Sequence, residues 1–573
     1  MSSAADAIIL DRVQALWNEA RRRLGGAVSA LESVRPRYVL AVLIVVQWAA
    51  VLALALTVRH AGWIFYQGGD QLWYYTVGWQ LAHGHLGIAG IGYLWPVLLA
   101  PISLATGPNV ANAYPAIILI DVLLLLPIGL LALYGIAERI AGRLFGYWAT
   151  ALWIALPFLG ITYANAGYHQ RFTELFLPQA LGLTAMADLP TLVAALVSGY
   201  FTARILFDEQ PQSLDAIAAG VAAGAAIGIK PATTLFLAGP ALALLAARRS
   251  KHAALFAVGL APALLAMTVF KWRGLGALPI ASPYESTRLA AGSLGLPLGF
   301  LNLGHYVNLD WGHFQENLAA VQEYFWSGRL VEWVPFAGAI ALARRSFGAM
   351  LLVVGWFAAF IVVKGTFVAA SLSDASLPRI LLPAYPMFVL LVAALPMLWP
   401  GVPRRLAARP ATENRRAGAR RRTLLVVAGI VGTAVLPLAA FAAVPLEKGT
   451  GIATFGVTPI PGNVNIGVRA TTGSDGAVTL TWNDQRESGG PVFYVVYRAP
   501  MSRPDYSCVL TPSSRCTVAL DNVGSTKTPR FVDRPGPGRW HYRIGVAANW
   551  LDSPNYGDVY VMSSHVAVTV PNG

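Results

Sequence analysis

A single carboxylate stands out in the segment YQGGDQLWYYTVGWQLAHGH, residues 66–85. Asp70 follows two glycines and precedes a dense set of aromatic residues. A carboxylate fixed at the surface of a membrane can take a proton from an incoming hydroxyl group as a general base. Aspartate is also a favoured helix N-cap, which stabilises a helix by about 1 kcal/mol. The two roles can coexist, so Asp70 is the first candidate for catalysis.

The residues after Asp70 predict a helix at the membrane surface. Leu72, Tyr75, Trp79 and Ala82 share one helical face. Tryptophan and tyrosine favour the interface between membrane and water. We therefore expect this helix to lie on the outer surface, with Asp70 at its N-terminal end.

The composition is that of an integral membrane protein. The chain has 573 residues, of which 56% are hydrophobic and 12% charged, and its mean hydropathy is +0.55. Soluble domains carry about 25% charged residues. The formal charge of +14 comes from arginines in short loops between apolar runs, as the positive-inside rule expects. A nucleic-acid partner is therefore not expected.

The apolar runs predict a polytopic α-helical membrane protein with about eleven spans. With the N-terminus in the cytoplasm, the arginine clusters fall inside, and loops 59–111 and 272–330 fall outside with the C-terminal tail. The expected spans are about 38–58, 112–137, 144–164, 186–206, 214–229, 232–247, 253–271, 331–343, 347–364, 380–399 and 423–444.

Residues 1–37 predict a cytoplasmic amphipathic segment and not a cleavable signal peptide. They are polar and mixed in charge, and the apolar run that follows is too long for a signal peptide. Ile8, Val13, Leu16 and Trp17 can rest on the cytoplasmic membrane surface. A loosely ordered tail is the alternative.

The composition changes after the membrane domain (38–445) and a linker (446–462). Residues 463–573 predict an extracytoplasmic all-β sandwich, because alternating segments are separated by turn sequences such as TGSDG and RPGPG. Trp482 in LTW and Tyr542 in YRIGVAAN resemble the early core tryptophan and late-strand tyrosine of fibronectin type III domains. The predicted strands are 477–482, 492–498, 539–549 and 565–570.

The two cysteines of the chain, Cys508 and Cys516, lie in this C-terminal domain. Two cysteines in one extracytoplasmic domain favour a disulfide bond. The cysteines and the predicted topology thus agree that the domain lies outside the cytoplasm.

Five segments between residues 38 and 400 place polar residues or breaks near the outer ends of the predicted spans. An isolated acid follows the first span, a second surface segment follows it, and later segments bring an acid, a lysine and an arginine. They are GGDQLWYYTVGWQLAHG with Asp70, YLWPVLLAPISLATG (93–107), MADLPTLVAAL with Asp188, AIGIKPATTLFL with Lys230, and PRILLPAYP (378–386) with Arg379.

In this order the segments resemble the GT-C class of membrane glycosyltransferases. The resemblance implies transfer of a sugar from a polyprenyl-phosphate donor to a cell-envelope acceptor at the outer face of the cytoplasmic membrane. The acceptor class is open between glycan, glycolipid and protein. That family often has two adjacent acids in the first loop, whereas Asp70 stands beside Gln71. A requirement for a divalent metal therefore stays open, and no other cofactor is expected.

Charge then assigns the roles. Asp70 is the expected base, and Arg379 and then Lys230 are expected to hold the donor phosphate, since arginine and lysine stabilise phosphate charge. Asp188 is expected to position Asp70, hold an ion or bind the acceptor. The structural alternatives are interfacial snorkelling for the two cations and helix capping for Asp188.

The loop 168–176 adds His169, Arg171 and Glu174 on the outer side as supporting or acceptor-binding residues. The spacing of Arg171 and Glu174 favours a structural ion pair on a helix. Loop 272–330 is expected to cover the active site. No metal-ligand spacing stands out in either loop.

Two other functions compete with this one. A transporter or flippase would place ionisable groups within the membrane, and Asp121 is the clearest acid inside a span. A membrane-anchored adhesion protein would use the β domain, but eleven spans exceed what an anchor needs. A nucleotide-sugar enzyme would need a cytoplasmic catalytic domain, and the predicted cytoplasmic segments are too short to fold one. The high alanine, arginine and glycine content favours a bacterial source.

Overall fold

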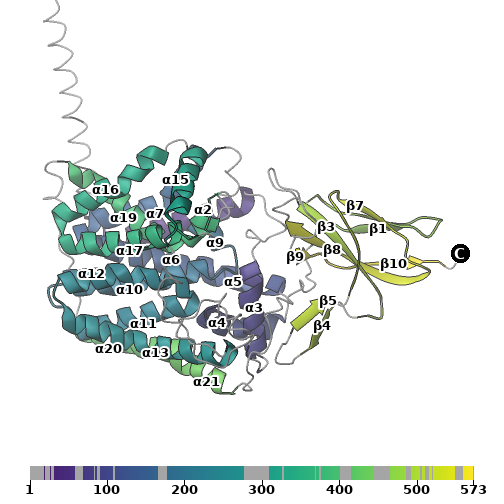
Figure 1. The fold of residues 1–573 in the computed structure, drawn as a ribbon, viewed down its shortest axis with the longest axis horizontal. Helices are drawn as coiled ribbons and strands as arrows, with labels where there is room; N and C mark the ends of the chain where they lie inside the picture. Colours follow the sequence, from purple (N-terminus) through teal and green to yellow (C-terminus); the bar gives the residue numbers. More distant parts are fainter. Residues whose placement is uncertain are drawn as a thin grey trace, which may run out of the picture.

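The computed structural model contains a helical part and a group of β strands that lie side by side (Figure 1). Helices extend to residue 443, and strands begin at residue 469. The structure describes residues 19, 26, 31, 33–57, 69–82, 84, 86, 91–107, 110–165, 177–275, 309–325, 328–367, 370–372, 376–399, 415–443, 465–484, 492–503, 506–509, 515–518, 520–548 and 559–571.

The helices follow the apolar runs of the sequence. Several are interrupted by prolines, which produce short 3-10 or π-helical turns labelled η. The elements are α2 (Pro36–Thr57), α3 (Gly69–Ala82), α4 (Leu94–Thr106), α5 (Val110–Ile120), η1 (Asp121–Leu125), α6 (Leu126–Ala141), α7 (Arg143–Tyr163), α9 (Pro178–Leu181), α10 (Asp188–Phe207), α11 (Ser213–Ile229), η3 (Pro231–Leu237), α12 (Ala238–Ala246), α13 (Ser250–Leu275), α15 (Trp311–Tyr324), α16 (Gly328–Arg345), α17 (Phe347–Gly365), α18 (Ser376–Ile380), η6 (Leu382–Ala384), α19 (Tyr385–Ala394), η7 (Leu395–Leu398), α20 (Arg415–Ile430), η8 (Val431–Val435) and α21 (Leu436–Ala443).

Seven helices in the described part of the chain are long and apolar enough to cross a membrane. They coincide with seven of the predicted spans. Three shorter apolar helices, Ser213–Ile229, Pro231–Ala246 and Leu382–Leu398, coincide with three more. The remaining predicted span, about 331–343, falls within α16. The helical membrane character is thus confirmed, while the count of eleven spans stays a prediction.

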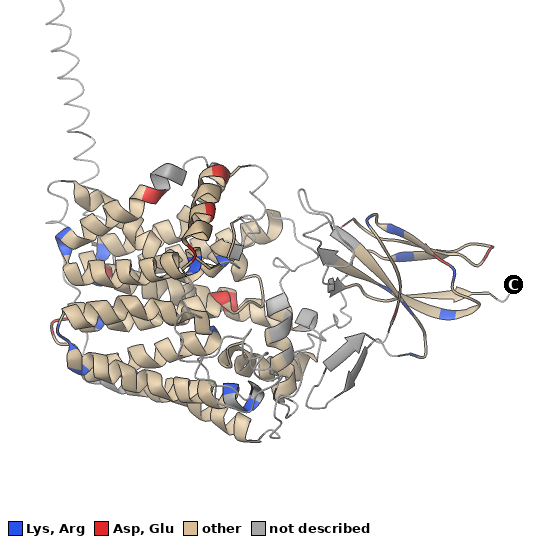
Figure 2. Ribbon diagram, in the orientation of Figure 1, with Lys and Arg blue, Asp and Glu red and all other residues tan. Residues whose placement is uncertain are grey.

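Many of the lysines and arginines of the helical part lie at the end that faces away from the β strands, and others lie nearer the strands (Figure 2). Arg139 lies 3.0 Å from Asp208, and Arg204 and Arg422 lie 3.3 and 3.7 Å from Asp215. These ion pairs join the ends of α6, α10, α11 and α20. The predicted arginine-rich loop ends therefore come together in space, and the side of the membrane that they face stays a prediction.

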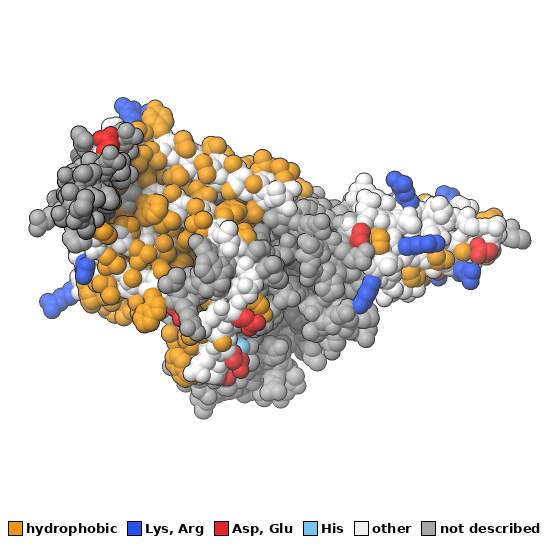
Figure 3. Space-filling model, turned by 90° about the horizontal axis from the view of Figure 1, so that it is seen from above, with side chains coloured by type: hydrophobic (Ala, Val, Ile, Leu, Met, Phe, Trp, Pro, Cys, Tyr) orange, Lys and Arg blue, Asp and Glu red, His pale blue; other side chains and the backbone are white. Residues whose placement is uncertain are grey.

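The visible surface of the helical part is largely apolar (Figure 3). Leu56 and Leu245 are 77% and 64% exposed, which is unusual for leucine in a soluble protein. Extended exposed apolar surface of this kind marks contact with a membrane or a partner. The surface agrees with a lipid environment around these helices.

Helices α3 and α4 pack against each other between the membrane helices and the β strands (Figure 1). The Tyr75 hydroxyl bonds Thr106 Oγ1 at 2.7 Å and the Gly107 carbonyl at 2.6 Å. Burial raises the pKa of Tyr75 to about 12, although the bond to Thr106 opposes this, so the hydroxyl stays neutral. Helix α3 was expected to bury one face; Tyr74 and Gln80 are buried as well as Tyr75. Helix α3 is therefore enclosed more fully than a surface helix.

Two membrane helices contain a π-helical turn just before a proline. In η1 the Leu126 amide donates to Asp121, and in η8 the Leu436 amide donates to Val431. The next residues, Pro127 and Pro437, have no N–H to donate. Main-chain carbonyls in both turns therefore need donors from elsewhere.

The β strands form two larger sheets and a hairpin. One sheet has the order β1-β2-β7, the other the order β10-β8-β3-β6 with β9 paired to β8, and β4 pairs with β5. The strands are β1 (Arg469–Thr472), β2 (Val478–Thr481), β3 (Val492–Pro500), β4 (Tyr506–Val509), β5 (Arg515–Val518), β6 (Asp521–Thr526), β7 (Arg530–Asp533), β8 (Gly538–Ala548), β9 (Val559–Met562) and β10 (Val566–Val570).

Buried side chains of both larger sheets belong to one apolar core. The rings of Trp482 and Tyr494 lie 5.1 Å apart, and Tyr542 is fully buried. The Tyr542 hydroxyl donates to Asp533 at 2.8 Å. All four predicted strand segments are strands, and the two aromatic residues singled out in the sequence lie in the core.

Candidate functional site

The first element of the candidate site is an ion pair at one end of the helical part. Lys230 Nζ lies 2.6 Å from Asp188 Oδ1. The Asp188 side chain is 1% exposed and the Lys230 side chain 20%. Because Pro231 follows, Lys230 adopts an extended backbone (φ −140°, ψ 103°) and ends α11. The proline thus determines where the lysine leaves the helix, while Asp188 opens α10.

Threonines lock these two helix ends together. The Thr191 hydroxyl donates to the Ala226 carbonyl at 2.7 Å, and it lies 3.1 Å from the Thr233 hydroxyl. Asp188 Oδ2 is buried and has no hydrogen-bond partner among the described residues. The second carboxylate oxygen thus keeps its capacity to accept a hydrogen bond.

The N-terminus of α3 reaches the same region. Gln71 Oε1 accepts a hydrogen bond from the Ala185 amide at 3.3 Å, and Trp95 donates to the Ala185 carbonyl at 3.1 Å. Ala185 lies three residues before Asp188. Asp70 is the second residue of α3 and the neighbour of Gln71, although its side chain lies outside the described part. The main chain therefore brings Asp70 to the segment that leads into Asp188.

A further cation, Lys364, stands at the end of α17. It is half-buried, and its ammonium group lies 4.9 Å from the centre of the Phe367 ring. Helix α17 packs against η3, the segment that follows Lys230, so the two lysines end neighbouring elements.

Arg379 enters the same end of the bundle through α18 and η6. The Trp356 indole donates to the Pro383 carbonyl at 2.8 Å, which ties η6 to α17. Segment η6 also packs against α10 and η3, the elements that carry Asp188 and follow Lys230. Arg379 lies in the last turn of α18, just before η6, and is half-buried.

Comparisons with known proteins add weak likenesses only. No family model and no curated protein matches the chain. Among solved structures, ArnT from Cupriavidus metallidurans bound to undecaprenyl phosphate is 15% identical, with a TM-score of 0.38 over 72% of this chain and 77% of that one. An archaeal oligosaccharyltransferase, AglB from Archaeoglobus fulgidus, is 13% identical, with a TM-score of 0.38 over 72% of this chain. The match spans 57% of that enzyme. Likenesses at this level do not assign the chain to a family.

Helix α15 is bound to the strap, the described residues 365–367 and 370–372 that follow Lys364. Asn317 is buried; its amide nitrogen donates to the Gly365 and Ala370 carbonyls at 3.0 and 2.8 Å, and its oxygen accepts from the Leu372 amide at 3.1 Å. Helix α15 belongs to loop 272–330, and the expected role of that loop as a cover of the active site stays a prediction.

His313 on α15 joins the same strap. Its Nε2 lies 2.9 Å from the Ala370 carbonyl, and its Nδ1 lies 3.2 Å from Glu316. The bond to Ala370 raises the pKa of His313, with Glu316 and Asp310 acting in the same direction and desolvation opposing them. The protonated ring therefore holds the strap best.

The structure pairs two of the predicted residues, Asp188 and Lys230. Arg379 lies in α18, which leads into η6, a segment that packs against α10 and η3. The predicted His169, Arg171 and Glu174 lie outside the described residues. Within the described ranges there is no group of three His, Cys, Asp or Glu side chains that could hold a metal ion.

Two residues of the site, Lys364 and Asn317, were not predicted from the sequence. The sequence does contain a signal for Lys364. This lysine ends the predicted span 347–364 on the predicted outer side, where the positive-inside rule does not expect a cation. Asn317 has none, because its role depends on where α15 docks.

The acid behind the transporter alternative, Asp121, lies in η1 and is fully buried. Neither carboxylate oxygen has a hydrogen-bond partner among the described residues. Asp121 belongs to no group of three His, Cys, Asp or Glu side chains within the described part, and its segment η1 packs against α10, the helix that Asp188 opens.

Proposed function

We propose that the chain is a GT-C-type membrane glycosyltransferase that uses a polyprenyl-phosphate sugar donor. Lys230, Lys364 and Arg379 hold the donor phosphate, Asp188 positions Lys230, and Asp70 is the base. The observation that carries the proposal is the Lys230–Asp188 pair at 2.6 Å, with α17, the helix that carries Lys364, packed against the segment that follows Lys230.

The chemistry assigns a task to each group. The acceptor hydroxyl gives its proton to the Asp70 carboxylate, and its oxygen bonds to the anomeric carbon of the donor sugar. The bond from that carbon to the phosphate oxygen breaks, and the polyprenyl phosphate leaves with the electron pair. The cations stabilise the charge that develops on the phosphate, an effect worth about 100-fold to 1000-fold for each preorganised group.

The position of the site favours a lipid-linked donor over a soluble one. Lys230 and Lys364 lie at the ends of apolar helices, and the face of the helical part seen in Figure 3 is largely apolar. A polyprenyl chain can stay in the bilayer while its phosphate reaches Lys230 and Lys364. The acceptor then approaches from the side of α3 and the β strands.

We also propose the location and the C-terminal domain as expected from the sequence. The basic end of the helices faces the cytoplasm, the N-terminus lies inside, and the site and β domain lie outside the cytoplasmic membrane of a bacterial cell. The strand orders β1-β2-β7 and β10-β8-β3-β6 support a fibronectin type III-like sandwich. Cys508 and Cys516 are paired across β4 and β5, which supports a disulfide bond.

The test is label transfer by the purified full-length chain in nanodiscs. A panel of radiolabelled polyprenyl-phosphate sugars and a crude envelope fraction supply donor and acceptor. Wild type is expected to bind a donor and transfer its label, while Lys230→Met loses donor affinity. If no member of the panel binds, the proposal is wrong, and transport of an envelope lipid or glycan becomes the better explanation.

A further inference from the structure

The loop between α3 and α4 ends in a tyrosine that touches the turn before Lys230. Tyr93 is fully buried and precedes α4. A Cβ added to Gly228 would lie 2.9 Å from the Tyr93 ring, so the ring lies flush against the helix backbone there. Gly92 packs in the same way on the carbonyl of Ile229. The last turn of α11, two residues before Lys230, therefore rests on residues 92–93.

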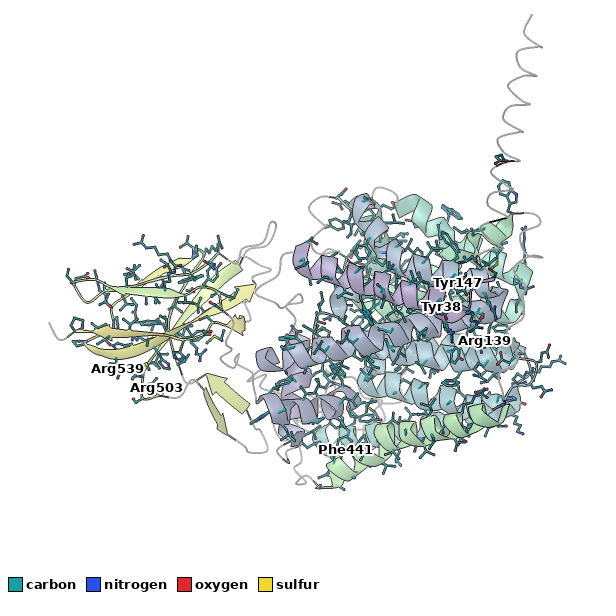
Figure 4. The ribbon with its side chains drawn as sticks, turned by 180° about the vertical axis from the view of Figure 1, so that it is seen from behind. Tyr38, Arg139, Tyr147, Phe441, Arg503 and Arg539 are labelled. Carbon is teal, nitrogen blue, oxygen red and sulfur yellow. The ribbon has the colours of Figure 1, made fainter. Side chains whose placement is uncertain are left out.

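The other side of Tyr93 contacts the last membrane helix. Its ring centre lies 6.0 Å from that of Phe441 in α21 and 6.3 Å from that of Phe270 in α13. Phe441 lies at the end of the bundle nearer the β strands, and Arg139 lies at the far end (Figure 4). Tyr93 is thus a wedge between α11 and the helix that leads to the β domain.

The hydroxyl of Tyr93 makes a bond that the helix itself cannot make. It donates to the main-chain carbonyl of Thr433 in η8. In a regular α-helix that carbonyl would accept from the amide of residue 437, but residue 437 is a proline. In an apolar interior an unpaired carbonyl is costly, so the Tyr93 hydroxyl is held firmly in place.

We propose that Tyr93 is a positioning residue. It fixes the turn at 228–230 against the last membrane helix, and so it holds Lys230 beside Asp188. The inference depends on the proposed function only for the identity of the ligand that Lys230 binds. The placement of Lys230 is measurable without any donor.

The first test measures the exposure of Lys230. The full-length chain in nanodiscs is treated briefly with an amine-specific acylating reagent, and the labelled peptides are quantified by mass spectrometry. Tyr93→Phe keeps the ring and removes the hydroxyl, and we expect Lys230 to label about three to ten times faster, in line with the loss of one hydrogen bond. Gly228→Ala, which pushes on the ring, should act in the same direction. The labelling rate of Lys251, which is exposed at the basic end, should not change.

The matched control is Tyr134→Phe. Tyr134 is also buried, and its hydroxyl donates to Glu138 at 2.9 Å at the basic end. It should leave the labelling of Lys230 unchanged. An unchanged Lys230 rate in both Tyr93→Phe and Gly228→Ala overturns the proposal. So does an equal rise in Tyr134→Phe, since the effect would then be a general loosening.

Pro437→Ala tests the role of the proline. It returns an amide donor to the Thr433 carbonyl, which then competes with Tyr93. We expect Lys230 to be labelled at the same rate in this variant as in Tyr93→Phe. In the double variant with Tyr93→Phe, Lys230 should be labelled no faster, because both substitutions remove the same hydrogen bond. Additive rates in the double variant would contradict the link through Thr433.

Affinity for undecaprenyl phosphate, measured in the same nanodiscs, separates this inference from the proposed function. If wild type binds it, Tyr93→Phe should bind about three to ten times more weakly, while Tyr134→Phe should bind like wild type. If wild type does not bind, the proposed function fails, and the labelling of Lys230 still decides on Tyr93.

Discussion

Lys230 Nζ lies 2.6 Å from Asp188 Oδ1, although the two residues belong to different helices and are 42 positions apart. The pair joins the last residue before a proline break to the first residue of α10. Each charge is largely removed from water, so each depends on the other. Under the proposed function, Asp188 therefore contributes both to the stability of the fold and to donor binding.

Asp188→Asn should therefore destabilise the protein and weaken donor binding. We expect the loss of the carboxylate to cost about 1–3 kcal/mol, since a partly buried lysine is left without its counter-ion. Thermal unfolding in detergent and donor affinity measure the two effects. The reversed pair, Asp188→Lys with Lys230→Asp, should recover the Tm without recovering transfer, because the cation is displaced. Recovery of transfer in the reversed pair would show that only the pair's presence matters.

Asp70→Asn should abolish most of the transfer while donor binding persists. Loss of a general base costs about 100-fold to 10,000-fold in rate. Single-turnover label transfer at saturating donor measures this directly. Asp310→Asn is the matched control: Asp310 caps α15 by accepting from the His313 amide at 3.0 Å, and asparagine caps a helix equally well. Survival of transfer in Asp70→Asn would return Asp70 to a structural role in the first turn of α3.

Lys364→Gln should lower kcat by about 100-fold and also raise the KM for the donor, because the cation acts both on the bound phosphate and on the charge that develops on it. The KM of the wild type should also rise with ionic strength, and that of the variant should rise less steeply. Arg344→Gln at the basic end controls for loss of a positive charge elsewhere. Equal KM values for wild type and Lys364→Gln would remove Lys364 from the site.

The strap held by His313 should be sensitive to pH. The pKa of His313 is raised by its bond to the Ala370 carbonyl, so the protonated ring stabilises the folded state. This contribution is complete below the ordinary histidine pKa of about 6.5 and is lost as the pH rises through the higher pKa of the folded protein. The Tm difference between wild type and His313→Gln, followed from pH 5 to pH 9, should shrink with rising pH. A difference that is constant, or that grows, contradicts the assignment.

The two cysteines of the β domain should be oxidised. They face each other in the antiparallel pair of β4 and β5, where Cα atoms lie about 4.5–5.5 Å apart, a separation that suits a disulfide. Alkylation should label them only after reduction. Reduction should cost the β domain about 2–3 kcal/mol of stability, and a Cys508→Ser, Cys516→Ser variant should be insensitive to reductant. Free labelling without reductant would exclude the bond.

The sequence predicted the elements better than their contacts. Apolar runs and arginine-rich ends located the membrane helices, and alternation with turn residues located the strands around Trp482 and Tyr542. These signals are local, so they are readable from a few residues at a time. The Lys230–Asp188 pair was not predicted, because it depends on how α10 and α11 pack.

The rest of the site depends on long-range docking. Asn317 acts through three main-chain groups between residues 365 and 372, and nothing in its own surroundings indicates them. Tyr93 and Thr433 are 340 positions apart. The local signal was Pro437, which indicates that a main-chain carbonyl in the preceding turn lacks its usual amide donor. It does not indicate which residue replaces that donor.

The two proline-linked π-turns also bear on how the chain is made. The Val122 carbonyl accepts from the Trp48 indole at 2.9 Å, and the Thr433 carbonyl accepts from Tyr93. In both cases the donor is synthesised long before the carbonyl. Because chains emerge from the ribosome N-terminus first, each donor can already stand in the bilayer when the helix with the open carbonyl is inserted. For these two helices, the order of the residues along the chain means that the hydrogen-bond donor is inserted before the helix that needs it.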